Sequence, residues 1–571
     1  MQYFSFTEST IIYRMFKKIT TYLNALFHHA DGIQATNKKW YYIFGIVLLL
    51  CCGIKLYYGI QNTMDVQYAD EAAYLRFGLD LFEKMNRNWG PLYAIWYKCL
   101  SYITTDTLQL YYLNFAVTSV LIGILLYIFL LRISVNVVFA LLIAFSVLVC
   151  DLNISVWPRI SHFCIALCLI ALIIISYLKN NIYKCIVFML LCLINAYARP
   201  EFYLSFLLMV FVTLVCIYYN KATISRKDIY IFSVTIILIG ILHSIFRFPS
   251  NDFFGFNRGV AAFYQHYAWN YKIRTHSSFD AWLYWEDIAR KQFGDCNSMW
   301  CVLKTQPMIV ISNTLFNLKN YCISIVLHIF TYVFPIGIFH WKKVQLLLTV
   351  LAISSFTFLI TRKNSRIYFL EKLYSYKLYL LILFCFITPT LLSCAVIMPR
   401  EHYVFLQILF IILILISAFG YLFELYNFKP LFIILFGILL FFATPRIKNY
   451  SFLKVNTTSN LPCNKILIQH LQKTYGNKLH TLFTNMPFAS GLLTTNFKEV
   501  NTIFDKKKQI PFSHYLDSAK VDIIILTPST FRDPHIKDDS TWIDFMSNYQ
   551  KLGFKKDVFS DCETYLLVKQ D

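Results

Sequence analysis

Long runs of apolar residues, separated by short polar segments, dominate the pattern of this chain. A helix that crosses a bilayer needs about 20 consecutive apolar residues. By this rule about twelve runs are predicted as membrane helices: residues 41–60, 109–131, 135–150, 162–178, 184–198, 201–219, 229–246, 320–340, 344–361, 378–397, 403–423 and 430–444. The first run begins too far along the chain for a secretory signal, so we expect it to remain as an anchor.

The composition agrees with this pattern. Of the 571 residues, 58% are hydrophobic and 18% are aromatic, whereas soluble domains are about 45–50% apolar. A soluble globular protein is therefore excluded. The chain is predicted to be an α-helical polytopic membrane protein.

The formal net charge of +21 has two explanations. A nucleic-acid partner is one, but basic loops on the cytoplasmic side explain the charge of a membrane protein more simply, so we expect no nucleic acid. Basic residues precede the first run and recur in later turns: Arg14, Lys17, Lys18, Lys38, Lys39, Lys179, Lys184, Lys221, Arg226 and Lys227. Segment 1–40 is then cytoplasmic, and the acidic loop that follows the first run lies on the outer face.

Two loops in the membrane region 41–444 are too long to be simple turns. Within loop 61–108, residues 72–85 and 92–103 have the spacing of amphipathic interfacial helices. Loop 247–319 is rich in aromatic residues, including Trp269, Trp282, Trp285 and Trp300. These indole rings suit either an aromatic belt at the lipid headgroups or the lining of a sugar site.

From residue 445 to residue 571 no spanning run occurs. Short β-like stretches at 521–526 and 564–568 alternate with helical patterns, which predicts a small α/β domain. Cys296 and Cys301 in the second loop, and Cys463 and Cys562 in this domain, could each form a disulfide in an oxidising compartment, although sequence alone cannot fix connectivity.

Adjacent carboxylates at Asp70 and Glu71 are the first candidate for chemistry. A carboxylate within hydrogen-bond reach can take the proton from an attacking hydroxyl, and we choose Asp70 for that role. The alternative is a solvated pair at the N-terminus of the helix that begins near Ala72, where carboxylates are favoured.

Two cationic segments lie at the ends of predicted membrane helices. In Tyr197-Ala198-Arg199-Pro200-Glu201, the guanidinium can hold a phosphate and Glu201 can orient it. The alternative is a snorkelling arginine beside a helix that starts at Pro200. In Met398-Pro399-Arg400-Glu401-His402-Tyr403, either Arg400 or His402 could face a phosphate, or the cluster could be merely interfacial.

Taken in order, these motifs resemble the GT-C glycosyltransferase superfamily, which includes protein O-mannosyltransferases and lipid A aminoarabinose transferases. The resemblance is carried by Asp70-Glu71-x-x-Tyr74, Gly90-Pro91-Leu92-Tyr93, Arg-Pro-Glu at 199–201 and the Arg400 to Tyr403 segment. It implies a GT-C-like fold of about 11 to 13 transmembrane helices with an extracytoplasmic α/β domain at 445–571.

The resemblance also implies an activity. A polyprenyl-phosphate sugar would be the donor and an extracytoplasmic lipid, glycan or protein the acceptor, with Asp70 as general base and Glu71 supporting the loop or the donor. Arg199 and Arg400, with His402, would bind the donor phosphate, and Glu201, Tyr93 and Tyr403 would support them. No metal or other cofactor is required, and a bacterial inner membrane is the expected location.

One departure from the family pattern leaves the sugar open. The aminoarabinose transferases have a lysine just before the Pro-Leu-Tyr segment, where this chain has Trp89-Gly90. Arg87 or Lys84 can substitute for it as a phosphate contact. Arg159, at the end of Val156-Trp157-Pro158-Arg159, is interpreted as mainly structural.

The span count presents a conflict. Twelve spans would return the C-terminal domain to the cytoplasm, whereas the resemblance places it outside, and the basic residues between 362 and 377 favour the cytoplasm. We therefore expect an odd count, about 11 or 13. Two other functions stay open: an envelope polysaccharide polymerase or ligase, which would not need Asp70-Glu71, and a transporter or flippase, which the nearly uncharged interiors of the runs disfavour.

Overall fold

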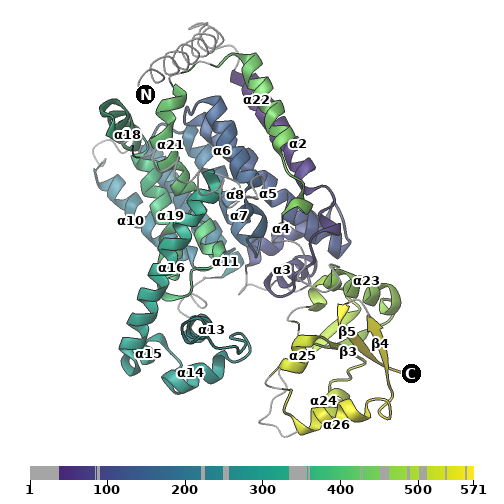
Figure 1. Ribbon diagram of the computed structural model, residues 1–571. Helices are drawn as coiled ribbons and strands as arrows, with labels where there is room; N and C mark the ends of the chain where they lie inside the picture. The colour runs from purple at the N-terminus through teal and green to yellow at the C-terminus, as the bar shows by residue number, and fades with distance from the viewer. Residues whose placement is uncertain are drawn as a thin grey trace, which may run out of the picture.

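The computed structural model describes residues 38–83, 85, 90–219, 225–247, 256–333, 357, 361–424, 426, 428–450, 462–484, 486, 489–500, 511–533, 536–559 and 562–570. These form a bundle of apolar helices with a separate sheet domain at one end (Figure 1). Lys84 and Arg87, the substitutes for the absent lysine, lie outside the described residues.

Within this part of the chain, six helices are long and apolar enough to cross a membrane. They are α2 (Lys38–Tyr57), α5 (Thr107–Arg132), α8 (Ile160–Tyr177), α10 (Phe202–Tyr219), α11 (Arg226–Phe246) and α19 (Lys377–Val396). Shorter apolar helices accompany them: α6 (Val137–Val149), α9 (Asn181–Ala196), α21 (Ile408–Glu424) and α22 (Pro430–Ala443).

These ten helices correspond to ten of the twelve predicted runs, and the details differ in two places along the chain. The run at 403–423 is divided between α20 (Glu401–Phe405) and α21, and a turn at Leu406 and Gln407 separates them. The run at 320–340 begins earlier than predicted, because α16 (Pro307–Val333) already includes the end of the second loop. Nearly all of the run at 344–361 lies outside the described residues.

Helices α2 and α22 lie side by side and run in the same direction. Lys55, in the last turn of α2, donates to the carbonyl oxygen of Phe441 in the last turn of α22 at 2.8 Å. Earlier in both helices, Gly437 lies against Phe44 and Leu48. If both helices cross the membrane, their parallel course requires an odd number of crossings, whatever the number between them.

The opposite ends of the helices gather around α18 (Lys363–Ser375). Lys372 forms an ion pair of 2.8 Å with Glu424 at the end of α21. Asn136, just after α5 ends, donates to the carbonyl oxygen of Phe423 at 3.0 Å. The basic segment 362–377, which includes α18, is therefore at the end of the bundle remote from α3 (Asp70–Leu79) (Figure 1).

The first loop forms short elements at the Asp70 end of the bundle. They are η1 (Ile60–Asn62), α3 (Asp70–Leu79) and α4 (Pro91–Ser101). Another short helix, α7 (Asp151–Ser155), belongs to the later segment between α6 and α8. The two amphipathic helices predicted in the first loop correspond to α3 and α4, although α3 ends six residues before the predicted 85. A buried face fixes α3, including Ala72, Ala73 and Leu75.

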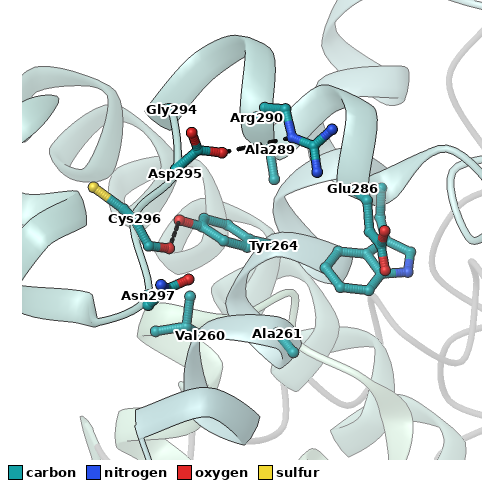
Figure 2. Close-up of a pocket in the computed structure, with 11 residues that line it drawn as sticks. Val260, Ala261, Tyr264, Glu286, Ala289, Arg290, Gly294, Asp295, Cys296 and Asn297 are labelled. Carbon is teal, nitrogen blue, oxygen red and sulfur yellow. Dashed lines mark hydrogen bonds and ion pairs between the residues drawn. The ribbon is translucent and has the colours of Figure 1, made fainter. Parts of the chain in front are cut away.

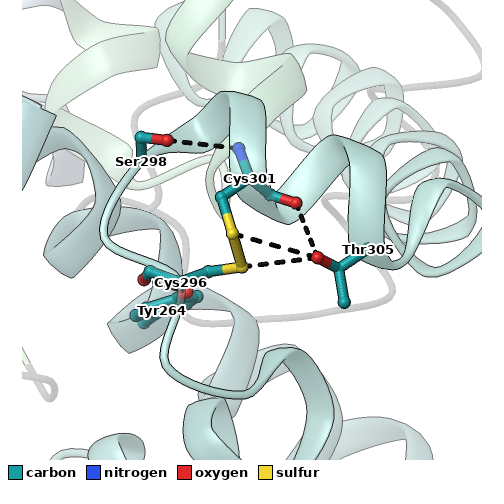
Figure 3. The surroundings of a disulfide bond; sticks show 5 residues. All are labelled: Tyr264, Cys296, Ser298, Cys301 and Thr305. Atoms are coloured by element: carbon teal, nitrogen blue, oxygen red, sulfur yellow. Dashed lines mark hydrogen bonds between the residues drawn. A yellow bond between two sulfur atoms is a disulfide. The ribbon is translucent and has the colours of Figure 1, made fainter.

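The second loop folds into α13 (Phe256–Thr275), α14 (Trp285–Phe293) and α15 (Met299–Thr305), around a small core that contains Phe263, Tyr267 and Phe293. Cys296 and Cys301 form a disulfide, and their Cα atoms are 5.5 Å apart. Figure 3 shows this bond beside the Thr305 hydroxyl, which donates to the Cys301 carbonyl oxygen at 2.9 Å. The disulfide joins the end of α14 to α15.

The C-terminal domain contains the predicted sheet. Five strands lie in the order β2-β1-β3-β5-β4, where β1 pairs parallel with β2 and β3, and β5 pairs antiparallel with β3 and β4. The strands are β1 (His480–Phe483), β2 (Phe497–Val500), β3 (Ile523–Leu526), β4 (Phe554–Phe559) and β5 (Thr564–Lys569). Helices α23 (Cys463–Tyr475), α24 (Phe512–Ser518), α25 (Pro528–Arg532) and α26 (Ser540–Asn548) accompany them, with η3 (Ile447–Asn449) and η5 (Ala489–Leu492).

This domain contacts the acidic loop directly. The Asp65 carboxylate accepts the backbone N–H groups of Asn464 and Lys465, each at 2.9 Å, at the start of α23. The second disulfide joins Cys463, at this same point, to Cys562. The C-terminal domain and the Asp70 loop therefore lie at the same end of the bundle, in agreement with an odd span count.

Candidate functional site

The carboxylate of Glu71 is completely buried and is held by four hydrogen bonds. Oε1 accepts from Tyr93 at 2.7 Å, from Tyr97 at 2.5 Å and from Asn114 Nδ2 at 3.0 Å. Oε2 accepts the backbone N–H of Arg159 at 2.7 Å. All four partners donate, which is the environment that suits an acceptor-only carboxylate.

These four partners come from three separate parts of the chain, so Glu71 fixes α3 in place. Tyr93 and Tyr97 are one turn apart on α4, Asn114 belongs to α5, and Arg159 precedes α8. Burial raises the pKa of the Glu71 carboxyl, although the hydrogen bonds from Tyr97 and Tyr93 oppose that rise. Since no face of this carboxylate is exposed, its position indicates a supporting role.

Asp70 has a different position from its neighbour. It is the first residue of α3, it is partly exposed, and it has interactions of its own. The preceding Ala69 has a φ of 63°, a conformation that costs a residue with a Cβ about 1–3 kcal/mol and persists where the surroundings enforce it. Glu71, two residues after Ala69, is held by its buried hydrogen bonds and so keeps the backbone of Ala69 in this conformation. The position of Asp70, between these two residues, is fixed as a result.

The start of α4 links α3 to the Arg-Pro-Glu segment. Gly90 has a φ of 58°, and a Cβ placed there would lie 2.5 Å from the Tyr74 ring and 3.1 Å from the Ala198 carbonyl oxygen. The Leu92 N–H donates to the carbonyl oxygen of Tyr197 at 3.2 Å. The Gly-Pro-Leu-Tyr segment is thus wedged between α3 and residues 197–198, which brings Arg199 near α3.

Arg199 is nearly buried, and its guanidinium is well supplied with partners. Nη1 donates to Ser161 Oγ at 2.8 Å, Nη2 forms an ion pair of 2.5 Å with Glu201, and the group lies 5.0 Å from the Tyr403 ring centroid. Burial lowers the pKa of Arg199, but Glu201 and Tyr403 outweigh burial and raise it overall. Glu201 is therefore paired with Arg199, and the binding of a phosphate by Arg199 stays a prediction.

The second cation, Arg400, lies at the contact between the large loop and the helix bundle. Its guanidinium lies 5.8 Å from the ring centroid of Trp282, and Trp282 also contacts the His266 ring. Arg400 is partly exposed, whereas Arg199 is not. Of the two arginines, Arg400 is consequently the more accessible to an anionic group.

His402 and His266 are buried among these cations. Burial, and then the charges of Arg199 and Arg400, lower the pKa of His402 well below its ordinary value. Burial and Arg400 lower the pKa of His266 to about 3. Both imidazoles are therefore neutral at physiological pH, so His402 can contact a phosphate as a neutral hydrogen-bond donor but adds no positive charge.

The position of His266 depends on three asparagines that the sequence analysis did not identify. Asn270, one turn after His266, donates to Asn313 at 2.9 Å and to Asn317 at 2.7 Å, which fixes α13 on α16. Asn317 in turn donates to the Ala395 carbonyl oxygen at 3.1 Å, close to the Arg400 segment. The large loop is thereby secured beside the predicted cationic segment.

The carboxylate and the cations meet through the start of α8. The Arg159 N–H binds Glu71, and two residues later the Ser161 hydroxyl binds Arg199, which lies over Tyr403. The structure thus brings together Asp70-Glu71, Tyr93, Arg199, Glu201 and the Arg400 to Tyr403 segment by direct contacts or through a single intervening segment.

Arg159 is structural, as predicted. Its side chain is fully buried, donates to the carbonyl oxygens of Asn153 and Val156 at 2.8 and 3.2 Å, and also contacts Ser119. Tyr97, Asn114 and Ser161 are not among the residues that the sequence motifs indicate. The spacing of Tyr93 and Tyr97, one turn apart, and a lone asparagine in the apolar run 109–131 are signals that could have indicated the first two.

A cavity lies within the large loop, apart from this site. It has a volume of about 270 Å³ and is bordered by Tyr264, Glu286, Arg290 and Asp295 (Figure 2). Arg290 and Asp295 form an ion pair of 3.7 Å between exposed side chains, and the Tyr264 hydroxyl donates to the Cys296 carbonyl oxygen at 2.8 Å. These contacts stabilise the disulfide-linked turn.

The fold defines a helical protein with several apolar helices suited to a multi-pass membrane protein, together with a small C-terminal sheet domain. No family model, no curated protein and no solved structure matches this chain. The resemblance to GT-C glycosyltransferases therefore stays an expectation that rests on the sequence motifs alone.

Proposed function

We propose that the protein is a membrane glycosyltransferase that moves a sugar from a polyprenyl-phosphate donor to an acceptor on the outer face. The observation that carries this proposal is the proximity of Asp70-Glu71 to the Arg199 and Arg400 segments, through residues 159–161. A base and a phosphate-binding cation are the two groups that this reaction needs on one face.

In the proposed reaction, the Asp70 carboxylate takes the proton from an acceptor hydroxyl. The acceptor oxygen forms a bond to the anomeric carbon as the bond from that carbon to the phosphate oxygen breaks. Displacement from the opposite face inverts the anomeric configuration. Polyprenyl phosphate leaves with the electron pair, and Arg400 stabilises the charge that develops on it.

Each supporting residue then has a role. Glu71 fixes the start of α3 and hence Asp70, through the hydrogen bonds from Tyr93 and Tyr97. Glu201 orients Arg199, and Arg199 orients Tyr403 beside Arg400. Glu71 is therefore a positioning residue. Arg400 makes the main contact with the donor phosphate.

The proposed location is the outer face of a bacterial inner membrane. Two disulfides, one in the large loop and one in the C-terminal domain, favour an oxidising compartment for that end of the molecule. Nucleotide sugars are not generally available there, which favours a lipid-linked donor. The basic segment 362–377, at the other end of the bundle, suits the cytoplasmic side.

The test is sugar transfer in membranes that contain wild type or Asp70→Asn, with a radiolabelled pool of polyprenyl-phosphate sugars. We expect a loss of transfer of about a hundredfold or more for Asp70→Asn. Asp80→Asn, at the other end of α3 and paired with Arg76 at 2.6 Å, is the matched control and should retain transfer. Unchanged transfer by a well-inserted Asp70→Asn would refute the assignment of the base, and no transfer by wild type from any lipid-linked sugar would refute the function.

A further inference from the structure

A second cavity lies between the large loop and the C-terminal domain, outside the site described above. Its volume is about 760 Å³, within the range of about 300–1,000 Å³ that is typical of ligand sites. The loop contributes Lys272, Asp280 and Tyr284, and the domain contributes Phe531, Arg532 and Lys537. Figure 1 shows these two parts, α13–α14 and α25, facing each other at the end of the molecule.

The charges in this cleft are mainly positive. Lys272, Arg532 and Lys537 line it, against the single carboxylate of Asp280. Asp280 accepts the backbone N–H of Trp282 at 2.9 Å, so part of its hydrogen-bonding capacity is already used. Lys537 has a weak ion pair with exposed Asp538 at 3.7 Å. The cleft therefore favours an anionic ligand.

Aromatic rings alternate with these cations. Lys537 lies 5.8 Å from the ring centroid of Tyr284, which joins the two sides of the cleft. Phe531 on the opposite wall is partly exposed. Flat rings of this kind cover the apolar face of a sugar, while lysine and arginine bind carboxylate or phosphate groups. The combination suits an acidic glycan better than a small inorganic anion.

One segment of the large loop links the cleft to the candidate site. Tyr284 and Leu283 line the cleft, and Trp282, in the same turn, contacts both His266 and Arg400. One short segment thus borders the cleft on one side and the cationic site on the other.

We propose that this cleft binds an acidic glycan, one that bears carboxylate or phosphate groups, as the acceptor. The role as acceptor rests on the proposed glycosyl transfer, whereas binding of an acidic glycan does not. The cleft is formed by two separate parts of the chain, so the C-terminal domain would supply half of the acceptor site.

The test measures binding of a fluorescent oligogalacturonate to the full-length protein in detergent, without donor. The cleft variant is Lys272→Gln with Arg532→Gln and Lys537→Gln. The control variant, Lys304→Gln with Lys498→Gln and Lys551→Gln, removes the same charge from exposed positions elsewhere. We expect the cleft variant to lose at least tenfold in affinity, the control variant to lose less than threefold, and a neutral malto-oligosaccharide of equal length to bind at least tenfold more weakly.

Several results would overturn the proposal. The first three are no binding by wild type, equal losses of affinity in the two variants, and equal binding of the neutral oligosaccharide. The fourth is that phosphatidylglycerol, supplied as vesicles, binds to the protein and is not displaced by oligogalacturonate. If binding behaves as expected but Asp70→Asn transfers sugar normally, the cleft stands and the assignment of the base fails. If transfer depends on Asp70 and the cleft variant binds like wild type, the cleft proposal alone fails.

Discussion

The phenol of Tyr93 donates a 2.7 Å hydrogen bond to the carboxylate of Glu71, across 22 residues of chain. This bond joins the Pro-Leu-Tyr segment to the acidic pair, the two motifs that most suggest a glycosyltransferase. It also separates the two acids by role, because Glu71 is occupied by structural partners while Asp70 stands partly exposed beside it.

Replacing Tyr93 by Phe should therefore destabilise the protein. The change removes one donor from a buried carboxylate and leaves the rest of the ring in place, so we expect a loss of about 1–3 kcal/mol in the free energy of unfolding. The melting temperature in detergent measures this loss. Tyr102→Phe, at a ring that is 77% exposed, is the control, and equal melting temperatures for both variants would contradict a structural role for Glu71.

Gly90 should tolerate no side chain. Its φ is 58°, and the Cβ of an alanine at this position would lie 2.5 Å from the Tyr74 ring; the backbone conformation alone costs about 1–2 kcal/mol. Gly90→Ala should consequently lower the melting temperature and weaken transfer, because the segment supports both α3 and residues 197–198. Gly259→Ala, in α13 with nothing within 4 Å of the added carbon, should leave both unchanged or raise stability slightly.

The sequence predicted the apolar helices and the small sheet domain, because long apolar runs and short alternating stretches depend on local spacing. The site formed by Asp70, Arg199 and Arg400 stays a prediction. The sequence could not predict what holds these segments together. The contacts of Asn114 with Glu71, and of Asn270 with Asn313 and Asn317, join residues from separate helices. A single asparagine in an apolar run has no pattern that identifies its partner.

The split of the run at 403–423 has a similar cause. Nothing in its hydropathy indicates a turn at Gln407, whose side chain accepts a hydrogen bond of 2.6 Å from Tyr321 on α16. An odd span count was expected from the family resemblance, and the contact between Lys55 and Phe441, which makes α2 and α22 parallel, is an independent observation in its favour. Both contacts depend on which helices become neighbours.

Acidic pH should destabilise the protein through His266. Its pKa is about 3 in the folded chain, lowered by burial and by Arg400, against about 6.5 in an unfolded chain. Between these values the unfolded state binds the additional proton, so stability falls as pH falls. From about pH 6.5 to about pH 5 the loss from this group is about 2 kcal/mol.

Melting temperatures measured from neutral to mildly acidic pH would reveal this effect. His266→Gln removes the titrating group and should flatten the acidic limb of the curve, although buried His402, whose pKa is also lowered, will preserve part of the slope. His276→Gln, at an exposed position just after the end of α13, should follow wild type. A curve for His266→Gln that parallels wild type would show that His266 is not the source.

Substitutions of Arg400 and Arg199 should differ in their effects on turnover and melting temperature. Arg400 is accessible, so Arg400→Gln should lower the turnover of donor by about 10²–10³ with little change in melting temperature, and Arg400→Lys should recover part of the activity because a charge remains. Arg199 is nearly buried between Ser161, Glu201 and Tyr403. Arg199→Lys keeps the charge but loses the planar fork and the stack, so it should lower the melting temperature and turnover together.

Adding Glu201→Gln separates these roles further. In wild type Glu201 orients Arg199 through their 2.5 Å ion pair. Glu201→Gln should therefore lower turnover less in the Arg199→Lys background than in wild type. Its effect on turnover should add to the effect of Arg400→Gln. Turnover and melting temperature of the single and double variants measure both couplings. If Arg199→Lys lowers turnover a hundredfold at an unchanged melting temperature, then Arg199 itself contacts the donor phosphate, and the division of roles between the two arginines is wrong.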